Sequence, residues 1–183
     1  MEFLGRIADR DTRLLSIQVL MGALSGHTEE EVNEVNAPAM AEERGIELGE
    51  SRSTGVRDYV DLIRVTVTSG DVRTRVAGTL IGQQHRPHLL EAWDRRFDVQ
   101  LEDHISLFRY RDVPGMIGRV GTAFGRHDIN IVSAAVGREP GESKTTRGQE
   151  ATMTVTTDSA VPREVIDEIV ASDGFEAGRT VTL

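Results

Sequence analysis

The chain has 183 residues, of which 38% are hydrophobic and 28% charged, with a formal net charge of -9 and no cysteine. This length can bury one moderate hydrophobic core or two small ones. The lack of cysteine excludes disulfides, thiolate nucleophiles and cysteine-ligated iron–sulfur clusters. No run approaches the ~18 apolar residues of a membrane span and no signal-peptide pattern is present, so we expect a cytoplasmic protein without a membrane partner.

The negative charge is concentrated between residues 28 and 50, which contain eight glutamates and one arginine. A solvated helix face explains this run better than a metal site, because no histidine or aspartate accompanies the glutamates at ligand spacing. Nucleic-acid binding requires a clustered basic face, and the sequence has none. We therefore expect neither a metal site nor a nucleic-acid partner.

In chain order, the first hundred residues predict an α+β domain with a mostly antiparallel sheet. A strand is expected at residues 3–8 and a helix at residues 12–24. Thr28 and Glu31 form a capping box that predicts a second helix, which Pro38 breaks or kinks. Alternating apolar residues then predict four strands, at residues 59–67, 72–81, 89–93 and 97–101.

A basic cluster, H-R-P-H-L-L-E-A-W-D-R-R-F, covers residues 85–97. His88, Arg95 and Arg96 could converge on an anion across adjacent strands, because arginine forks and histidine suit phosphate or carboxylate oxygens. From the residues alone, solvated strand side chains are the favoured interpretation. His85 and His88 also form an H-x-x-H pair, but without a third ligand they do not predict a metal site.

The segment 110–130, Y-R-D-V-P-G-M-I-G-R-V-G-T-A-F-G-R-H-D-I-N, predicts the end of a strand, a helix and the start of another strand. A helix N-terminus behind Gly115 presents free amides that favour a carboxylate, while Asp112 can hold an ammonium group. Asn130 adds a donor and an acceptor. One small site could thus bind both charges of an amino acid, although the residues alone favour a helix cap for Asp112 and a turn residue for Asn130.

Glycines at 115, 118 and 121 form G-x-x-G-x-x-G after a strand. The G-x-G of a dinucleotide-binding turn is missing, so we expect no cofactor in this chain. Close packing of the helix against its sheet or a partner explains Gly118 and Gly121 better, because they share one helical face.

From residue 105 the predicted order is β-α-β-β-α-β, the ferredoxin-like plan. The strands and helices are expected at residues 105–110, 116–124, 129–136, 151–157, 162–171 and 175–183, with a mobile polar hairpin loop at 138–149. We place a first domain at residues 1–101 and a second at residues 103–183.

The corner at 110–130 resembles the ligand-binding corner of an ACT domain. The string E-E-V-N-E-V-N-A-P-A-M-A-E-E-R-G-I at residues 30–46, with G-T-L-I-G and R-F-D downstream, resembles the allosteric substrate-binding (intervening) domain of long-form D-3-phosphoglycerate dehydrogenases. In that family the intervening domain directly precedes a terminal ACT domain. The resemblance covers nearly the whole chain and implies a regulatory, non-catalytic portion of an NAD-dependent oxidoreductase of serine biosynthesis. NAD would belong to a catalytic half that this chain lacks, and we expect no catalytic residues here.

The resemblance also implies a ligand and an assembly. L-serine would bind as feedback effector at interfaces between ACT domains of a homo-oligomer, with Tyr110, Asp112, Gly115 and Asn130 as effector-binding residues. A phosphate-bearing anion would bind near the basic cluster. There the sequence departs from the family pattern, since it has His88 in place of the expected lysine and glutamine in place of an expected arginine at residue 100.

Two alternatives belong to other classes of function. A stand-alone amino-acid-sensing ACT module, acting on another partner in trans, would keep the corner and need no anion site. An enzyme using the histidines and carboxylates as acid and base is the less favoured alternative, because no Ser-His-Asp, metal or phosphate-loop arrangement supports it.

Overall fold

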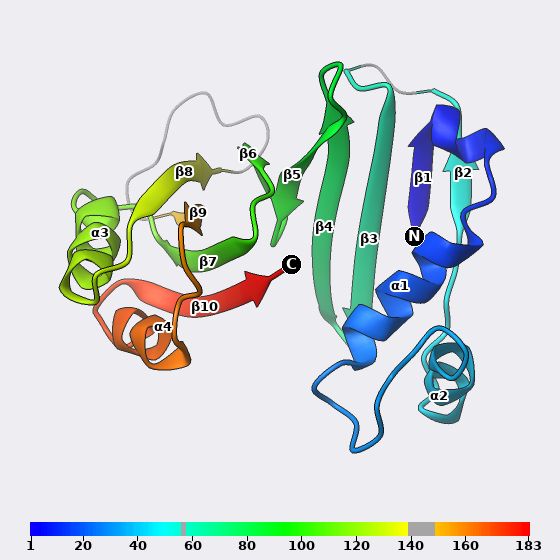
Figure 1. Cartoon of the computed structure of the whole chain (residues 1–183), viewed down its shortest axis with the longest axis horizontal. Coiled ribbons are helices and arrows are strands. Elements are labelled where there is room, and N and C mark those ends of the chain that lie inside the picture. Colours follow the sequence, from blue (N-terminus) through cyan, green and yellow to red (C-terminus); the bar gives the residue numbers. More distant parts are fainter. Residues whose placement is uncertain (56–57, 139–148) are drawn as a thin grey trace. The chain divides into compact units, whose positions relative to one another are not determined.

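The computed structural model describes residues 1–55, 58–138 and 149–183 (Figure 1). The chain folds as two compact units, residues 1–67 and 68–183. This division falls earlier than the predicted domain boundary between residues 101 and 103, which stays a prediction. Within the described residues, no helix combines the length and apolar character needed to cross a membrane.

The first unit is built around a strand that has a neighbour on each side. Its elements are β1 (Glu2–Gly5), the 3-10 helix η1 (Arg6–Asp9), α1 (Arg13–Leu24), α2 (Ala37–Glu43), β2 (Ser51–Ser53) and β3 (Asp61–Ser69), which ends just past the unit boundary. β1 pairs in parallel with β2 and antiparallel with β3, which is compatible with the predicted, mostly antiparallel sheet. A small core joins the two helices through Leu20, Leu24, Ala37 and Ala41.

The prediction of a helix starting after Thr28 is wrong, because α2 begins at Ala37. The Thr28 hydroxyl donates to a backbone carbonyl two residues further on, and no capping box forms. Asn33 and Asn36 instead form a turn, in which each side-chain oxygen accepts the backbone N–H of the other residue. Pro38 lies in the first turn of the helix rather than breaking it, since its missing N–H falls where amides have no helical partner.

The second unit starts with an antiparallel meander of β4 (Val72–Ile81), β5 (Arg86–Ala92) and β6 (Arg95–Gln100). Trp93 and Asp94 connect the last two strands, with positive φ values of 51° and 60°. Two consecutive left-handed residues are the signature of a type I′ turn, which matches the twist of a tight hairpin. The three predicted strands are confirmed, with small shifts at their ends.

The rest of the second unit is the predicted ferredoxin-like fold. Its elements are β7 (His104–Arg111), α3 (Met116–Arg126), β8 (Ile131–Gly137), β9 (Glu150–Thr157), α4 (Arg163–Val170) and β10 (Phe175–Thr182). The strand order is β10-β7-β9-β8, and neighbouring strands are antiparallel. Most of the predicted polar loop at 138–149 lies outside the described residues.

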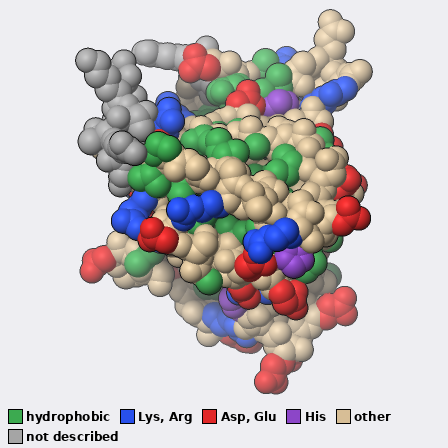
Figure 2. Space-filling view, turned by 90° about the vertical axis from the view of Figure 1, so that its left-hand side faces the viewer, with side chains coloured by type: hydrophobic (Ala, Val, Ile, Leu, Met, Phe, Trp, Pro, Cys, Tyr) green, Lys and Arg blue, Asp and Glu red, His purple; other side chains and the backbone are tan. Residues whose placement is uncertain are grey.

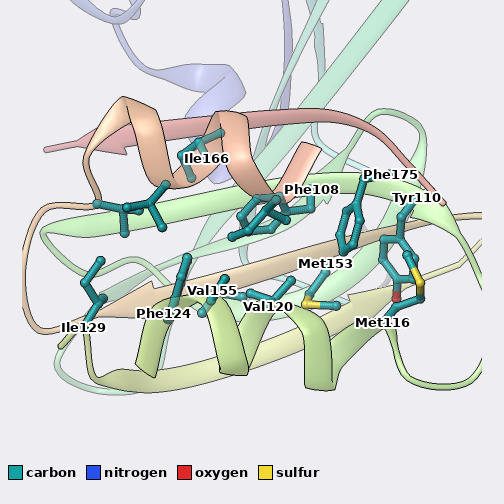
Figure 3. Close-up of a cluster of buried hydrophobic side chains, with 14 of the residues drawn as sticks. Phe108, Tyr110, Met116, Val120, Phe124, Ile129, Met153, Val155, Ile166 and Phe175 are labelled. Carbon is teal, nitrogen blue, oxygen red and sulfur yellow. The ribbon is translucent and has the colours of Figure 1, made fainter. Parts of the chain in front are cut away.

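A continuous hydrophobic core fills the space between this sheet and its two helices (Figure 3). Phe108 of β7 is fully buried, and its ring lies 6.2 Å from that of Phe124 and 5.9 Å from that of Phe175. Met116 and Val120 bring the first turns of α3 into the same cluster. The β7–α3 corner is therefore held on a rigid, well-packed scaffold.

The glycines of α3 do not bring the helix close to its own sheet. Apart from the adjoining helix backbone, a Cβ atom added at Gly118 or Gly121 would meet no atom of the described residues within 4 Å, whereas Met116, Val120 and Phe124 form the buried face. The prediction of close packing against the sheet is wrong, because the glycines lie on the opposite side of the helix from these residues. Packing of this glycine face against a partner stays a prediction.

Candidate functional site

An open cavity of about 520 Å³ lies at the β7–α3 corner. It is formed by the end of β7, the start of α3 and the end of β8, through Tyr110, Asp112, Val113, Pro114, Gly115, Met116, Ile117, Gly118, Val136 and Arg138. Three of the four predicted effector-binding residues line this cavity, namely Tyr110, Asp112 and Gly115.

The helix start presents backbone amides to the cavity. Gly115 precedes α3 with a φ of 97°, a conformation that glycine adopts without steric cost. No side chain of the described residues caps the helix through a hydrogen bond, so the interpretation of Asp112 as a helix cap is wrong. Uncapped amides at a helix N-terminus favour a negatively charged group, and these amides line a cavity large enough for a small ligand.

Asp112 carries the negative charge of the site. Its Oδ2 accepts a hydrogen bond from Nε of Arg138 at 3.0 Å. The Asp112 side chain is 17% exposed and that of Arg138 is 53% exposed, so the acid is held in the wall and the base lies at the rim. The backbone N–H of Asp112 donates to the carbonyl of Gln149 at 2.6 Å, which fixes the acid beside the start of β9.

Arg138 also lines the cavity, although nothing in the sequence singles it out. No motif marks it, because it follows a strand and opens a polar segment. Only the sheet topology indicates its position. β7 and β8 both pair antiparallel with β9, so they run in the same direction and their C-termini lie at the same end of the sheet. A charged residue just after either strand therefore lies at that end.

Tyr110 belongs to the core as much as to the site. Its side chain is almost fully buried, and its ring lies 5.8 Å from that of Phe175, beside Met116 (Figure 3). Burial raises the pKa of Tyr110 to about 12, with a smaller contribution from the Asp112 charge, while Arg138 acts in the opposite direction. At neutral pH the phenol is therefore uncharged, and it forms a wall of the cavity.

Asn130 lies at the other end of the sheet. Its N–H donates to Oδ1 of Asp158 at 3.3 Å, and its carbonyl accepts from the Asp158 N–H at 3.2 Å. Along β9, the first residue of β8 pairs with Thr157, whereas Tyr110 pairs with Ala151. Thr157 and Ala151 are six positions apart, which corresponds to about 20 Å along the strand. One copy of the chain therefore does not bring Asn130 to the cavity.

The three residues of the predicted anion site do not converge. Nδ1 of His88 lies 2.6 Å from Oδ1 of Asp98. The residue of β5 that pairs with Arg96 is three positions beyond His88, a separation of about 10 Å along the strand. Each side chain thus has a separate environment.

Arg95 and Arg96 instead connect β6 to the second sheet. Nε of Arg95 donates to the backbone carbonyl of Glu150 at 3.1 Å, and its Nη2 lies 3.6 Å from the Glu150 carboxylate. Nε of Arg109 lies 4.0 Å from the same carboxylate. The backbone N–H of Arg96 donates to the carbonyl of Arg138 at 3.2 Å. A protein carboxylate therefore occupies the position beside Arg95 that an anion would require.

Charges of both signs lie beside one another on the face shown in Figure 2, around exposed hydrophobic side chains. Ion pairs such as those of Arg126 with Glu168 and Arg111 with Asp173 neutralise basic side chains of the second unit. Such mixed charge is unlike the continuous basic surface that binds a phosphate backbone.

Comparison with known proteins agrees with this architecture. Residues 1–91 match the model of the D-3-phosphoglycerate dehydrogenase intervening domain, and residues 105–173 match the model of the ACT domain. Neither model is that of a cofactor-binding domain.

Relatives named D-3-phosphoglycerate dehydrogenase match over the same region. The protein of Archaeoglobus fulgidus is 34% identical over 174 residues, which are 93% of this chain and 31% of the relative. That of Mycobacterium leprae is 34% identical over 171 residues, 92% of this chain and 31% of the relative. That of Methanocaldococcus jannaschii is 34% identical over 166 residues, 90% of this chain and 30% of the relative.

The chain spans about a third of the length of these curated relatives, and the part that it matches comprises the intervening and ACT domains. By this pair of domains, in this order, the chain belongs to the D-3-phosphoglycerate dehydrogenase family.

Proposed function

We propose that this chain is the amino-acid-sensing regulatory portion of a cytoplasmic D-3-phosphoglycerate dehydrogenase, and that it binds L-serine as a feedback effector at the β7–α3 corner. The cavity at that corner carries the proposal, because it combines uncapped helix amides with the carboxylate of Asp112. These two features complement the carboxylate and the ammonium group of a free amino acid. The dehydrogenation itself would require NAD and catalytic domains that this chain does not contain.

In this proposal each predicted residue has a distinct role. Asp112 binds the ligand ammonium group, and the glycine at 115 lets the backbone approach the ligand carboxylate without a side chain in between. Tyr110 closes the inner wall of the cavity as a neutral, buried ring. Asn130 lies about 20 Å from this wall in the same chain, so it would reach the ligand only from a second copy.

The effector site would then be shared between two chains of a homo-oligomer. In a two-fold dimer, each site would take Asp112 from one chain and Asn130 from the other. This arrangement predicts complementation between variants: Asp112→Ala and Asn130→Ala should each lose serine binding, whereas co-refolded mixtures should regain it. Random pairing at equal amounts leaves about a quarter of the sites intact. A mixture that binds no better than either variant alone would contradict a shared site.

The first test is calorimetric titration of the chain with L-serine, with glycine and 3-phosphoglycerate as comparison ligands. Asp112 makes a charge-assisted contact in the proposal, so Asp112→Ala should weaken serine binding by about ten- to hundredfold. Asp167→Ala is a matched control, because that carboxylate pairs with Arg163 on the exposed face of α4. No saturable binding of any amino acid by the folded, oligomeric chain would refute the effector site.

A stand-alone sensing module that acts in trans is the second candidate, and such a module needs no anion site. The basic cluster favours it, because His88 is paired with Asp98 and Arg95 contacts Glu150, so these side chains are engaged within the protein. The phosphate-bearing anion site at His88, Arg95 and Arg96 stays a prediction. Binding of 3-phosphoglycerate that Arg95→Gln abolishes would support this anion site and the dehydrogenase assignment, whereas serine binding without it would favour the module acting in trans.

A further inference from the structure

The rim of the corner cavity carries a positive charge directly beside its negative charge. Arg138 follows the last residue of β8 and lines the cavity opposite the start of α3. Its side chain is 53% exposed, so a ligand in the cavity can reach it. Its backbone carbonyl is held by the N–H of Arg96 at 3.2 Å, which anchors the side chain at this position.

The guanidinium of Arg138 uses only part of its hydrogen-bonding capacity. Nε donates to Oδ2 of Asp112 at 3.0 Å, and among the residues that the structure describes Nη1 and Nη2 have no partner. Those two groups form the planar fork that matches the two oxygens of a carboxylate. In the same way, Oδ1 of Asp112 makes no hydrogen bond to a described residue and can accept one from an ammonium group.

We propose that Arg138 binds the α-carboxylate of the ligand, and that the Asp112–Arg138 pair therefore selects molecules with an ammonium and a carboxylate on the same carbon atom. This inference rests on the proposed function and adds to it a residue that holds the ligand carboxylate. The two protein charges are in direct contact, so their remaining hydrogen-bonding atoms lie close together. An α-amino acid presents its two charges at the matching short separation, whereas a ligand with only one of them leaves one protein charge uncompensated.

The alternative is that the α3 amides alone hold the carboxylate. Arg138 would then be a passive partner of Asp112, and its removal would leave the preference for a carboxylate unchanged. The two possibilities differ in one measurable quantity, the ratio of the dissociation constants of L-serine and L-serinamide, because serinamide keeps the ammonium group and lacks the carboxylate.

The experiment is a calorimetric titration of the full chain with both ligands at about pH 6, where the α-amino groups are protonated. Wild type should bind L-serine about ten- to hundredfold more tightly than L-serinamide, as expected for a charge-assisted fork. In Arg138→Gln this ratio should fall by about three- to tenfold, because the amides at the start of α3 still favour the carboxylate. Arg138→Lys keeps the charge but not the fork, so its ratio should lie between the two.

Arg163→Gln serves as the matched control, because Arg163 is a 73% exposed arginine that pairs with Asp167 on α4. Its ratio should equal that of wild type. Retention of the full ratio in Arg138→Gln, with loss of serine binding in Asp112→Ala, would overturn the role of Arg138 and leave the effector site standing. Failure of wild type to bind any amino acid would overturn both.

Discussion

The contact between β6 and β8 provides a sharp test of the packing, through the substitution Gly137→Ala. Gly137 is the last residue of β8 and precedes Arg138 in the cavity wall. A Cβ atom at this position would lie 2.6 Å from Cδ1 of Phe97 and 2.9 Å from the carbonyl oxygen of Arg96. The Phe97 ring can rotate away, but the Arg96 carbonyl is backbone. The substitution should therefore push β6 away from β8.

The magnitude follows from two contributions. Forcing one methyl group into a packed contact costs about 1–3 kcal/mol, and weakening the 3.2 Å hydrogen bond from Arg96 to Arg138 costs about 1 kcal/mol more. The expected loss of unfolding free energy is thus about 2–4 kcal/mol. For a chain of this size that corresponds to a Tm lower by roughly 4–16 °C.

The assay is thermal unfolding followed by circular dichroism at one fixed protein concentration. Gly121→Ala is the matched control, because it adds the same methyl group to α3, where no described residue beyond the adjoining helix backbone lies within 4 Å. It should stabilise the chain by about 0.5–1 kcal/mol through the better helix propensity of alanine. A Tm of Gly137→Ala equal to or above that of wild type would refute the close approach of the two strands.

Three further predictions address the core of the second unit. Gly178→Ala places a Cβ atom 2.7 Å from Val170 and 2.8 Å from Ile166, so we expect a loss of about 1–3 kcal/mol in urea unfolding, and unchanged stability would contradict the packing of α4 on β10. Thr154 is fully buried, and its hydroxyl has no hydrogen-bond partner within the described residues. Thr154→Val should therefore raise the free energy of unfolding by about 1 kcal/mol. A decrease in that free energy by more than about 1 kcal/mol would indicate a partner for the hydroxyl. The folded-state pKa of Tyr110, about 12, lies above its ordinary value of 10.0, so its contribution to stability is complete below pH 10 and is lost as the pH rises towards 12. Tyr110→Phe should therefore gain stability relative to wild type between pH 10 and 12, as measured by urea unfolding, and a constant difference between the two proteins would contradict the raised pKa.

The second unit was the easier part to predict because its residues alternate with the correct period. β7 buries Phe108 and Tyr110 at strand spacing, and α3 buries residues at helical spacing, so local pattern and tertiary packing agree. Six elements in this order admit few arrangements with short connections, which made the ferredoxin-like sheet predictable.

The second helix of the first unit was mispredicted because two local signals competed. Thr28 and Glu31 have the spacing of a capping box. The asparagines at 33 and 36, however, accept backbone N–H groups through their side chains and form a turn that directly precedes the helix. The proline at 38 was interpreted as a breaker, although proline equally favours the first turn of a helix. Sequence spacing alone does not decide which signal prevails.

The candidate site was predictable only in the part that is local in sequence. Asp112 and Gly115 lie in one continuous segment with the start of α3, and the cavity forms there. Arg138 reaches the same cavity from another strand, and Asn130 lies at the far end of the sheet, so both placements depend on strand order and direction. For the same reason the sequence could not show whether His88 and Arg95 lie together, since the register of β5 and β6 sets the distance between them.

Arg138 connects the proposed ligand site to the meander through two different atoms. Its side chain contacts Asp112 in the cavity, and its backbone carbonyl accepts the N–H of Arg96 in β6. A ligand that binds between Asp112 and Arg138 therefore acts on the residue that anchors β6 to β8. Such coupling is reciprocal. A change that separates β6 from β8 and thereby displaces Arg138 must also alter the affinity of the corner for its ligand, provided that the ligand interacts differently with the displaced arginine. The position of one arginine, rather than the cavity alone, thus gives an amino-acid sensor at this corner a physical connection to the β4–β6 meander.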